Sequence, residues 1–446
     1  MTKDLTRGTP WKLILQFALP IMAGNLLQQL YNTADTIIVG NFNGQQALSA
    51  VGACASLTVL FTALAIGFSV GAGVLISQYF GAARERELRQ YAATAIVLML
   101  AMGLFMSAVG LVSARVLLKQ LLGTPDTLLR QAVLYFRIYA AGLVFQFGYN
   151  IAAALLRALG DSRATLYFLL VSSALNVVLD LLFVAGLRMG VAGAAIATVL
   201  SQLASCVIGF VYMHRKYALL RFSLRELRAD AKTAVRILKI GAPMALQQSI
   251  VSCGFLFLQR LVNSYGESMI ASYTVASRME NILMIPVLGI QNTMATFAGQ
   301  NMGAQRPDRV EKGLGQGVLV SLCMTLVLCL CQIFGGSLII CAFRLDADAA
   351  AICRLHLFSS AAAIPIFAVY FPANGMCQGV GEGFHATFYA FLALGLRVVF
   401  AYALHTTALF GYTAIWWSQA MAWTVTLIVC YLHFFRGKWK NKSLIQ

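Results

Sequence analysis

The feature that most constrains this chain is a series of twelve long apolar stretches separated by short polar segments. An α-helix needs about 20 apolar residues to cross a hydrocarbon layer of about 30 Å, and each stretch meets that length. The sequence therefore predicts a protein that crosses the membrane many times. The predicted spans are residues 13–39, 52–79, 91–114, 131–156, 164–186, 190–213, 237–263, 270–301, 314–340, 354–379, 384–407 and 411–435.

The composition supports helical spans rather than strands. Hydrophobic residues make up 60% of the chain and charged residues only 11%, whereas a soluble domain carries about 25% charged residues. Most stretches are apolar all round and rich in Gly, Ala and Ser, which suits closely packed membrane helices better than the alternating strands of a barrel. We therefore expect an all-α polytopic membrane protein.

The basic charge of the chain indicates its topology. The net charge is +17, which in a soluble protein would favour nucleic acid as a partner. Most of the 33 Lys and Arg, however, lie in segments that face the same side as the N-terminus. Because cytoplasmic segments are enriched in these residues, both termini are predicted to be cytoplasmic. We expect the lipid bilayer, and no nucleic acid, as partner, in a cell membrane such as the bacterial cytoplasmic membrane.

The two halves of the chain repeat each other. Pro20 aligns with Pro243, and SQYFGAAR (77–84) aligns with GQNMGAQR (299–306). Further on, RALGDSRAT (157–165) aligns with QGVGEGFHAT (378–387) after one insertion. The similarity runs through all six spans of each half, which chance does not explain.

The repeat predicts the domain organisation. A basic segment, residues 214–236, separates the halves, and we expect an N-terminal lobe at 1–222 and a C-terminal lobe at 223–446. Each half has an even number of spans, so the repeats are parallel and related by an axis along the membrane normal. Two six-helix bundles around a central cleft are typical of alternating-access carriers. A purely structural duplication is the alternative.

Ionisable and polar residues gather inside the spans of the first half. A charged side chain in the bilayer costs about 2.5–3.5 kcal/mol on insertion scales, so each one needs a partner or a function. Asp35 lies in the first span, Asn176 and Asp180 lie one helical turn apart in the fifth, and Thr198 lies in the sixth. Two carboxyl groups without a nearby cation share or take up protons, or bind a cation such as Na⁺. The alternative is a structural role, with the carboxyls bonded to helix backbones.

The second half does not repeat this group. The alignment places Leu258 opposite Asp35 and Ala401 opposite Asp180. Arg397 falls next to the position of Asn176, and Glu280 lies at a similar depth in the eighth span. We expect Glu280 and Arg397 to form a buried pair in the C-terminal lobe, or Glu280 to contact a cationic substrate instead.

At these residues the chain resembles the multidrug and toxic compound extrusion (MATE) transporters, over nearly its whole length. Two six-span halves, each with a Gly-Ala-x-Arg segment after its second span, carry the likeness. Asp35, Asn176, Asp180 and Thr198 match the cation site of the family's DinF-like branch, and Pro20 matches that branch's bending proline. The acids that the other branch uses in its C-terminal lobe are missing at Leu258 and Ala401.

The resemblance implies an ion-coupled antiporter that exports amphiphilic or cationic organic compounds. The implied coupling ion is Na⁺ or H⁺, no cofactor is expected, and we expect a monomer that acts on small-molecule substrates. A flippase of lipid-linked sugars is the nearest alternative among transporters.

Two other function classes fit the sequence less well. An intramembrane aspartyl enzyme would use Asp35 and Asp180 as a catalytic pair, but it needs no internal repeat, and the five histidines and the serines show no nucleophile-plus-base motif. A channel would require polar residues around a symmetric pore, and one half lacks the acids. We therefore expect a carrier and not an enzyme.

Overall fold

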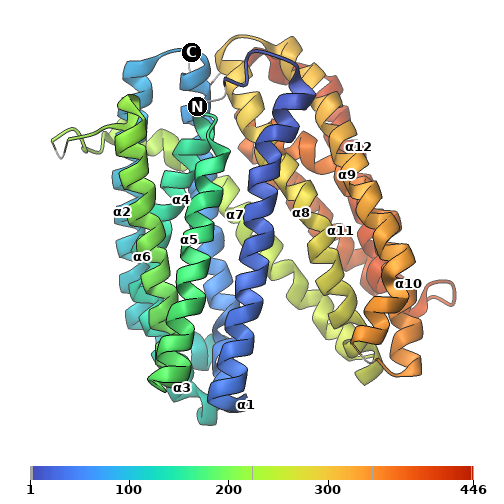
Figure 1. The fold of residues 1–446 in the computed structure, drawn as a ribbon. Coiled ribbons are helices and arrows are strands. Elements are labelled where there is room, and N and C mark those ends of the chain that lie inside the picture. Colours follow the sequence, from blue (N-terminus) through green and yellow to red (C-terminus); the bar gives the residue numbers. More distant parts are fainter. Residues whose placement is uncertain (1–3, 224, 344, 443, 445–446) are drawn as a thin grey trace. The chain divides into compact units, whose positions relative to one another are not determined.

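The computed structural model describes residues 4–223, 225–343, 345–442 and 444, without the side chains of 251–257, 342 and 441. All regular structure in this part of the chain is helical (Figure 1). The prediction of an all-α fold is confirmed, and the helices lie where the apolar stretches predicted them.

The first two predicted spans form one long element, α1 (Pro10–Gly81), of 72 residues. Gly44 interrupts it with φ 77° and ψ 179°, a backbone conformation that favours glycine because a side chain would clash. Gly44 divides α1 into a first arm, residues 10–43, and a second arm, residues 45–81. In Figure 1 the chain runs along the first arm and returns along the second. The reversal therefore occurs at Gly44, and helix continues on both sides of it into residues 40–51, which lie between the first two predicted spans.

The remaining helices of the first half follow in order. They are α2 (Glu85–Val116) with the π-helical turn η1 (Leu117–Leu121), α3 (Asp126–Ala141), α4 (Leu143–Ala158), α5 (Ser162–Asp180) with the π-helical segment η2 (Leu181–Gly186), α6 (Gly190–Lys216) and η3 (Ala218–Leu220). The axes of α3 and α4 differ by 44° across Gly142, so the predicted fourth span is bent.

Six long helices also make up the described part of the second half. In chain order the elements are α7 (Ala231–Asn263), α8 (Glu267–Gly303), α9 (Pro307–Ala342), α10 (Ala347–Gly379), α11 (Gly383–Leu404), η4 (Gly411–Thr413), α12 (Ala414–Phe435) and η5 (Lys438–Asn441). Nine elements in the described part are long and apolar enough to cross a membrane, or ten with the bent pair α3 and α4. With α1 crossing twice and α7 completing the set, the chain has twelve membrane-spanning helices in two bundles.

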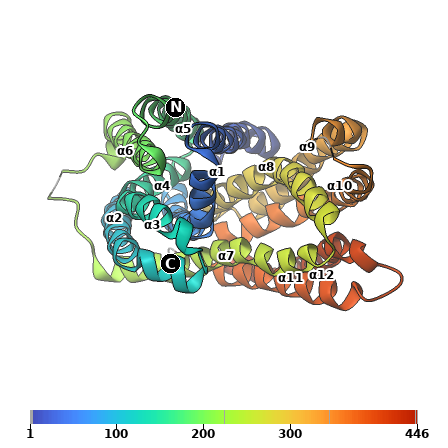
Figure 2. The same cartoon turned by 90° about the horizontal axis from the view of Figure 1, so that it is seen from below.

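The helices pack into two compact units. The first contains residues 23–249, where α2 packs on α3 and α4, and α6 packs on α4 and α5 (Figure 2). The second contains residues 5–22 and 250–446, where α8 packs on α9 and α10, and α11 packs on α12. The division into an N-terminal six-helix lobe at 1–222 and a C-terminal six-helix lobe at 223–446 stays a prediction.

Small residues permit very close helix contacts within each unit. A Cβ atom added at Gly375 of α10 would lie 2.2 Å from the carbonyl oxygen of Gln291 in α8, and one at Gly379 would lie 2.3 Å from that of Ala295. These two glycines are four residues apart and therefore lie on one face of α10. The backbones of α8 and α10 approach closely because that face carries no side chains, as in other membrane helix pairs.

Candidate functional site

The carboxyl groups of Asp35 in α1 and Asp180 in α5 are neighbours within the first unit and interact directly. Asp180 is fully buried, and neither of its oxygens has a hydrogen-bond partner of ordinary geometry among the described residues. Oδ1 of Asp35 is likewise buried without such a partner. The two predicted acids thus come together at one place.

Asn176 joins this pair on α5. It lies four residues before Asp180, which places both side chains on the same face of the helix. Its side chain is 2% exposed, and among the described residues neither its amide nitrogen nor its amide oxygen has a hydrogen-bond partner. A buried polar group without a partner costs about 1–3 kcal/mol, so the cluster is held together at an energetic cost.

The backbone changes its winding at this point. Asp180 is the last α-helical residue of α5, and the π-helical segment Leu181–Gly186 begins directly after it. π-Helical turns are rare and occur often at functional sites, because the wider turn loosens the hydrogen-bond ladder and redirects side chains. No residue pattern indicates this π-helical segment in advance, because it lies within an ordinary apolar stretch.

Thr198 lies on α6, the helix that packs against α5. Its hydroxyl donates a hydrogen bond to the carbonyl oxygen of Ala194, 3.0 Å away in the same helix. No interaction recorded for the described residues joins Thr198 directly to the carboxyl groups. The hydroxyl oxygen keeps its lone pairs for another ligand, so Thr198 stays a predicted member of the site.

Two tyrosines, Tyr31 and Tyr135, lie near Asp35, and sequence reasoning did not identify them. Tyr31 of α1 and Tyr135 of α3 both lie near enough to Asp35 to interact electrostatically with it. Tyr139 donates a hydrogen bond to Oε1 of Gln146 at 2.9 Å. The available signal was spacing: Tyr31 lies four residues before Asp35, and Tyr135 lies four residues before Tyr139, each pair on one helix face.

The arrangement determines what the acids can do. Among the described residues no salt bridge joins Asp35 or Asp180 to a Lys or Arg, and the neighbours that interact electrostatically with Asp35 include the phenols of Tyr31 and Tyr135. Two adjacent carboxyl groups in a buried site cannot both stay ionised without a counter-charge. They can take up a proton, or they can offer oxygen ligands to a hard cation such as Na⁺.

The equivalent place in the second unit is apolar. Leu258 and Ala401, the residues aligned with Asp35 and Asp180, are 1% and 0% exposed and belong to one buried hydrophobic cluster with Tyr273, Ile415 and Trp416. The aligned positions are therefore close together in both halves. In the first half they are two interacting acids, and in the second they belong to one apolar cluster.

Glu280 and Arg397 both lie in the second unit. Oε1 of Glu280 accepts a hydrogen bond from Nε2 of Gln419, a residue of α12. Arg397 is 5% exposed and close enough to His356 for their charges to interact, and the ring of His356 stacks on that of Trp416. No salt bridge between Glu280 and Arg397 is recorded for the described residues, and their pairing stays a prediction.

Pro20 lies inside the first arm of α1, which continues through it as a helix. Proline has no backbone N–H, so one hydrogen bond of the helix is missing there and bending is easier. Pro20 stays a predicted hinge.

Comparison with known proteins gives the family. The profile of the MatE family matches residues 20–182 and, a second time, residues 243–403. The two matched segments begin at Pro20 and Pro243, the prolines that align in the internal repeat. The duplication read from the sequence therefore corresponds to two copies of one family unit.

Relatives and solved structures agree with that family. The probable multidrug resistance protein YpnP of Bacillus subtilis is 32% identical over 307 residues, 69% of this chain and 68% of the relative. The multidrug export protein MepA of Staphylococcus aureus is 24% identical over 417 residues, 92% and 90% of the two chains. A solved multidrug resistance MATE family transporter in an outward-facing conformation is 26% identical, with a TM-score of 0.92 and 99% of both chains covered. The chain therefore belongs to the multidrug and toxic compound extrusion (MATE) family, whose members are membrane transporters and not enzymes.

Proposed function

We propose that this transporter exports amphiphilic, often cationic organic compounds in exchange for Na⁺ or H⁺, with Asp35 and Asp180 as the coupling site. The observation that carries the proposal is the pair of neighbouring carboxyl groups inside the bundle. Asp180 is fully buried and Asp35 is half-buried, and both oxygens of Asp180 and Oδ1 of Asp35 lack a hydrogen-bond partner of ordinary geometry. A cation or proton supplies what this site is missing. The proposal also assigns the chain to the DinF-like branch of the family.

The coupling step follows from electrostatics. Without a bound cation, two ionised carboxyl groups repel each other and draw water or a proton into the bundle. A bound Na⁺ or H⁺ removes that repulsion and lets α1 and α5 pack tightly. A ligand shifts a conformational equilibrium only by its differential affinity for the two conformations. The distance between the two carboxyl groups sets the affinity for the cation, so a conformational change that alters this distance provides that difference.

Further residues have supporting roles in the proposal. Asn176 and Thr198 offer an amide and a hydroxyl oxygen, which are suitable ligands for Na⁺ beside the carboxylates. Pro20 lets the first arm of α1 bend when the cation binds. In the second lobe Glu280 either pairs with Arg397 or faces the substrate; its hydrogen bond from Gln419 leaves its other carboxylate oxygen for either role.

The substrate class rests on the relatives, which are named multidrug resistance and multidrug export proteins. We propose a monomer without a cofactor, with both termini in the cytoplasm and the chain in a bacterial cytoplasmic membrane. A flippase of lipid-linked sugars is the second candidate function, and no feature of the described residues favours it.

The test is export of a cationic dye by purified protein in lipid vesicles, with a Na⁺ gradient and a pH gradient imposed separately. Either the Na⁺ gradient or the pH gradient is expected to drive dye accumulation in vesicles with the wild type, and not in vesicles with Asp35→Asn or Asp180→Asn. Asp126→Asn is the matched control, because it makes the same chemical change at an exposed carboxylate that pairs with Lys119. If both site variants accumulate dye like the wild type, the coupling site is wrongly assigned.

A further inference from the structure

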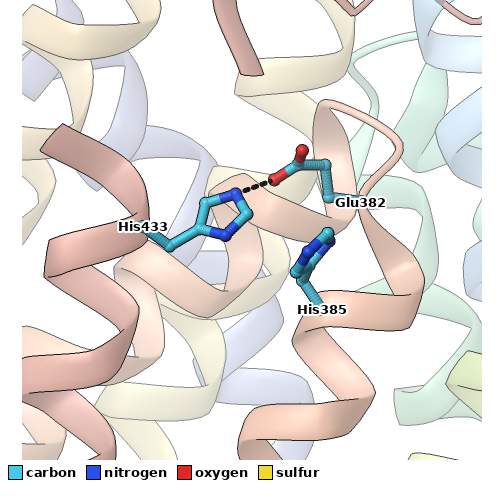
Figure 3. Close-up of side chains that lie close together, drawn as sticks. All are labelled: Glu382, His385 and His433. Atoms are coloured by element: carbon cyan, nitrogen blue, oxygen red, sulfur yellow. Dashed lines mark hydrogen bonds and ion pairs between the residues drawn. The ribbon is translucent and has the colours of Figure 1, made fainter. Parts of the chain in front are cut away.

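A second cluster of chemistry-bearing residues lies far along the chain from the acid pair, at the start of α11 and the end of α12. Glu382, His385 and His433 gather there (Figure 3). They line a cavity of about 230 Å³ together with Arg436, Lys438 and Lys442. Neither the transport proposal nor the family relationship uses these residues.

Local structure brings the three side chains together. Glu382 is the N-cap residue of α11 and His385 follows three residues later, in the first turn. Residues three apart lie on the same side of a helix, and a Glu-x-x-His pair is a known way for one helix to supply two metal ligands. His433 comes from the last turn of α12, which packs against α11.

The distances suit a shared ligand. Nε2 of His433 lies 2.9 Å from Oε2 of Glu382, and the ring centroids of His385 and His433 are 4.3 Å apart. One possible ligand atom from each residue lies within 4.8 Å of the other two. Figure 3 shows the ring of His433 directed at the carboxylate, with His385 beneath both. Tetrahedral ligands at about 2.0–2.2 Å from Zn²⁺ lie about 3.4 Å from one another. The contact between His433 and Glu382 would therefore open slightly, and any separation near the 4.8 Å limit would shorten by about 1 Å.

The carboxylate already attracts positive charge. The Glu382 side chain is 1% exposed, and Nζ of Lys442 lies 2.8 Å from its Oε1. The Lys442 side chain is 53% exposed and lies beyond the last described helix, so it can leave without disturbing the helices. Lysine and a metal ion would compete for the same carboxylate.

The repeat shows that the histidines are particular to this half. The aligned acid of the first half is Asp161, the N-cap residue of α5. Its Oδ2 accepts hydrogen bonds from the hydroxyls of Tyr212 at 2.9 Å and Tyr217 at 2.5 Å, and from Nζ of Lys216 at 3.2 Å. Phenols and an ammonium are donors that satisfy a carboxylate. Glu382 keeps an ammonium partner in Lys442, but imidazoles stand where the first half has phenols, and neutral imidazoles are metal ligands.

We propose that Glu382, His385 and His433 bind a divalent transition-metal ion, with Zn²⁺ preferred by this set of two nitrogens and one carboxylate. The bound ion joins the first turn of α11 to the last turn of α12 and displaces Lys442. Water completes the coordination, and the cavity has room for it.

The experiment measures Zn²⁺ binding to the purified full-length protein in detergent, without a histidine tag, by competition with a chromophoric chelator. Co²⁺ absorption spectra report the coordination. We expect one Zn²⁺ per chain and a rise in the melting temperature. His385→Gln is the main variant, because the salt bridges of Glu382 to His433 and Lys442 do not involve it. It is expected to weaken binding by about tenfold or more, as are His433→Gln and Glu382→Gln.

Two kinds of control separate the site from chance binding. His214→Gln and His405→Gln change histidines outside the cluster and are expected to leave Zn²⁺ affinity unchanged. Lys442→Gln is expected to tighten binding, because it removes the competing ammonium. The proposal is overturned if no stoichiometric Zn²⁺ binds, or if His385→Gln binds like the wild type. It is also overturned if inorganic phosphate rather than Zn²⁺ raises the melting temperature and Lys442→Gln abolishes that effect, since the cavity would then bind an anion.

Discussion

Replacing Asp180 by leucine is expected to make the protein more stable while abolishing coupled export. Asp180 is fully buried, and both carboxylate oxygens lack hydrogen-bond partners of ordinary geometry. Each buried polar group without a partner costs about 1–3 kcal/mol, and a leucine of similar size has none to leave unpaired. Asp180→Leu should therefore raise the free energy of unfolding by about 1–3 kcal/mol.

Reversible unfolding in mixed detergent micelles, in buffer free of Na⁺ and substrate, measures this difference. Asp180→Asn keeps a buried polar group and should stay close to the wild type. Val178→Leu is the matched control, because Val178 lies on the same helix with 60% of its surface exposed. A free energy of unfolding that is lower by about 1 kcal/mol or more in Asp180→Leu, about a fivefold change in the folding equilibrium, would refute the reasoning. It would mean that the carboxyl group stabilises the fold.

Three further results are expected. Gly375→Ala should destabilise the protein by about 1–3 kcal/mol, because its Cβ would lie 2.2 Å from the carbonyl oxygen of Gln291, whereas Gly395→Ala, which meets nothing within 4 Å, should be neutral in the same thermal unfolding assay. Burial raises the pKa of Asp161, but hydrogen bonds from Tyr217 and its other partners outweigh that effect and hold the pKa below its usual range. Asp161→Asn should therefore be less stable than wild type at neutral pH, and the difference should shrink as the pH falls below about 3.9 in acid titrations of unfolding. Pro20→Ala should slow dye export from vesicles, because it restores the missing hydrogen bond of α1 and makes the helix harder to bend.

The spans and the acid pair could be predicted because their signals are local. Long apolar stretches indicate helices that lie in the bilayer, and an acidic residue within such a stretch is easily recognised. The repeat alignment also matched the right positions, since Leu258 and Ala401 meet in one apolar cluster. The fold of each unit follows from these patterns and from small residues such as Gly375.

Other features depend on contacts between distant segments. The tyrosines around Asp35 look like ordinary aromatic residues of a span until packing brings Tyr135 beside the acid. The Glu-x-x-His segment at Glu382 gains its third member from His433, 51 residues away. The π-helical segment after Asp180 changes only hydrogen-bond spacing, which leaves no mark on composition.

The most direct test of the central claim is to record ion movement driven by the substrate. Vesicles containing the purified protein are given a substrate gradient and no ion gradient, and Na⁺ and pH are followed inside them. The account predicts that substrate moving one way drives Na⁺ or H⁺ the other way in the wild type and in Asp126→Asn, and that Asp35→Asn and Asp180→Asn show no such ion movement. Ion movement of wild-type size in both site variants would contradict it.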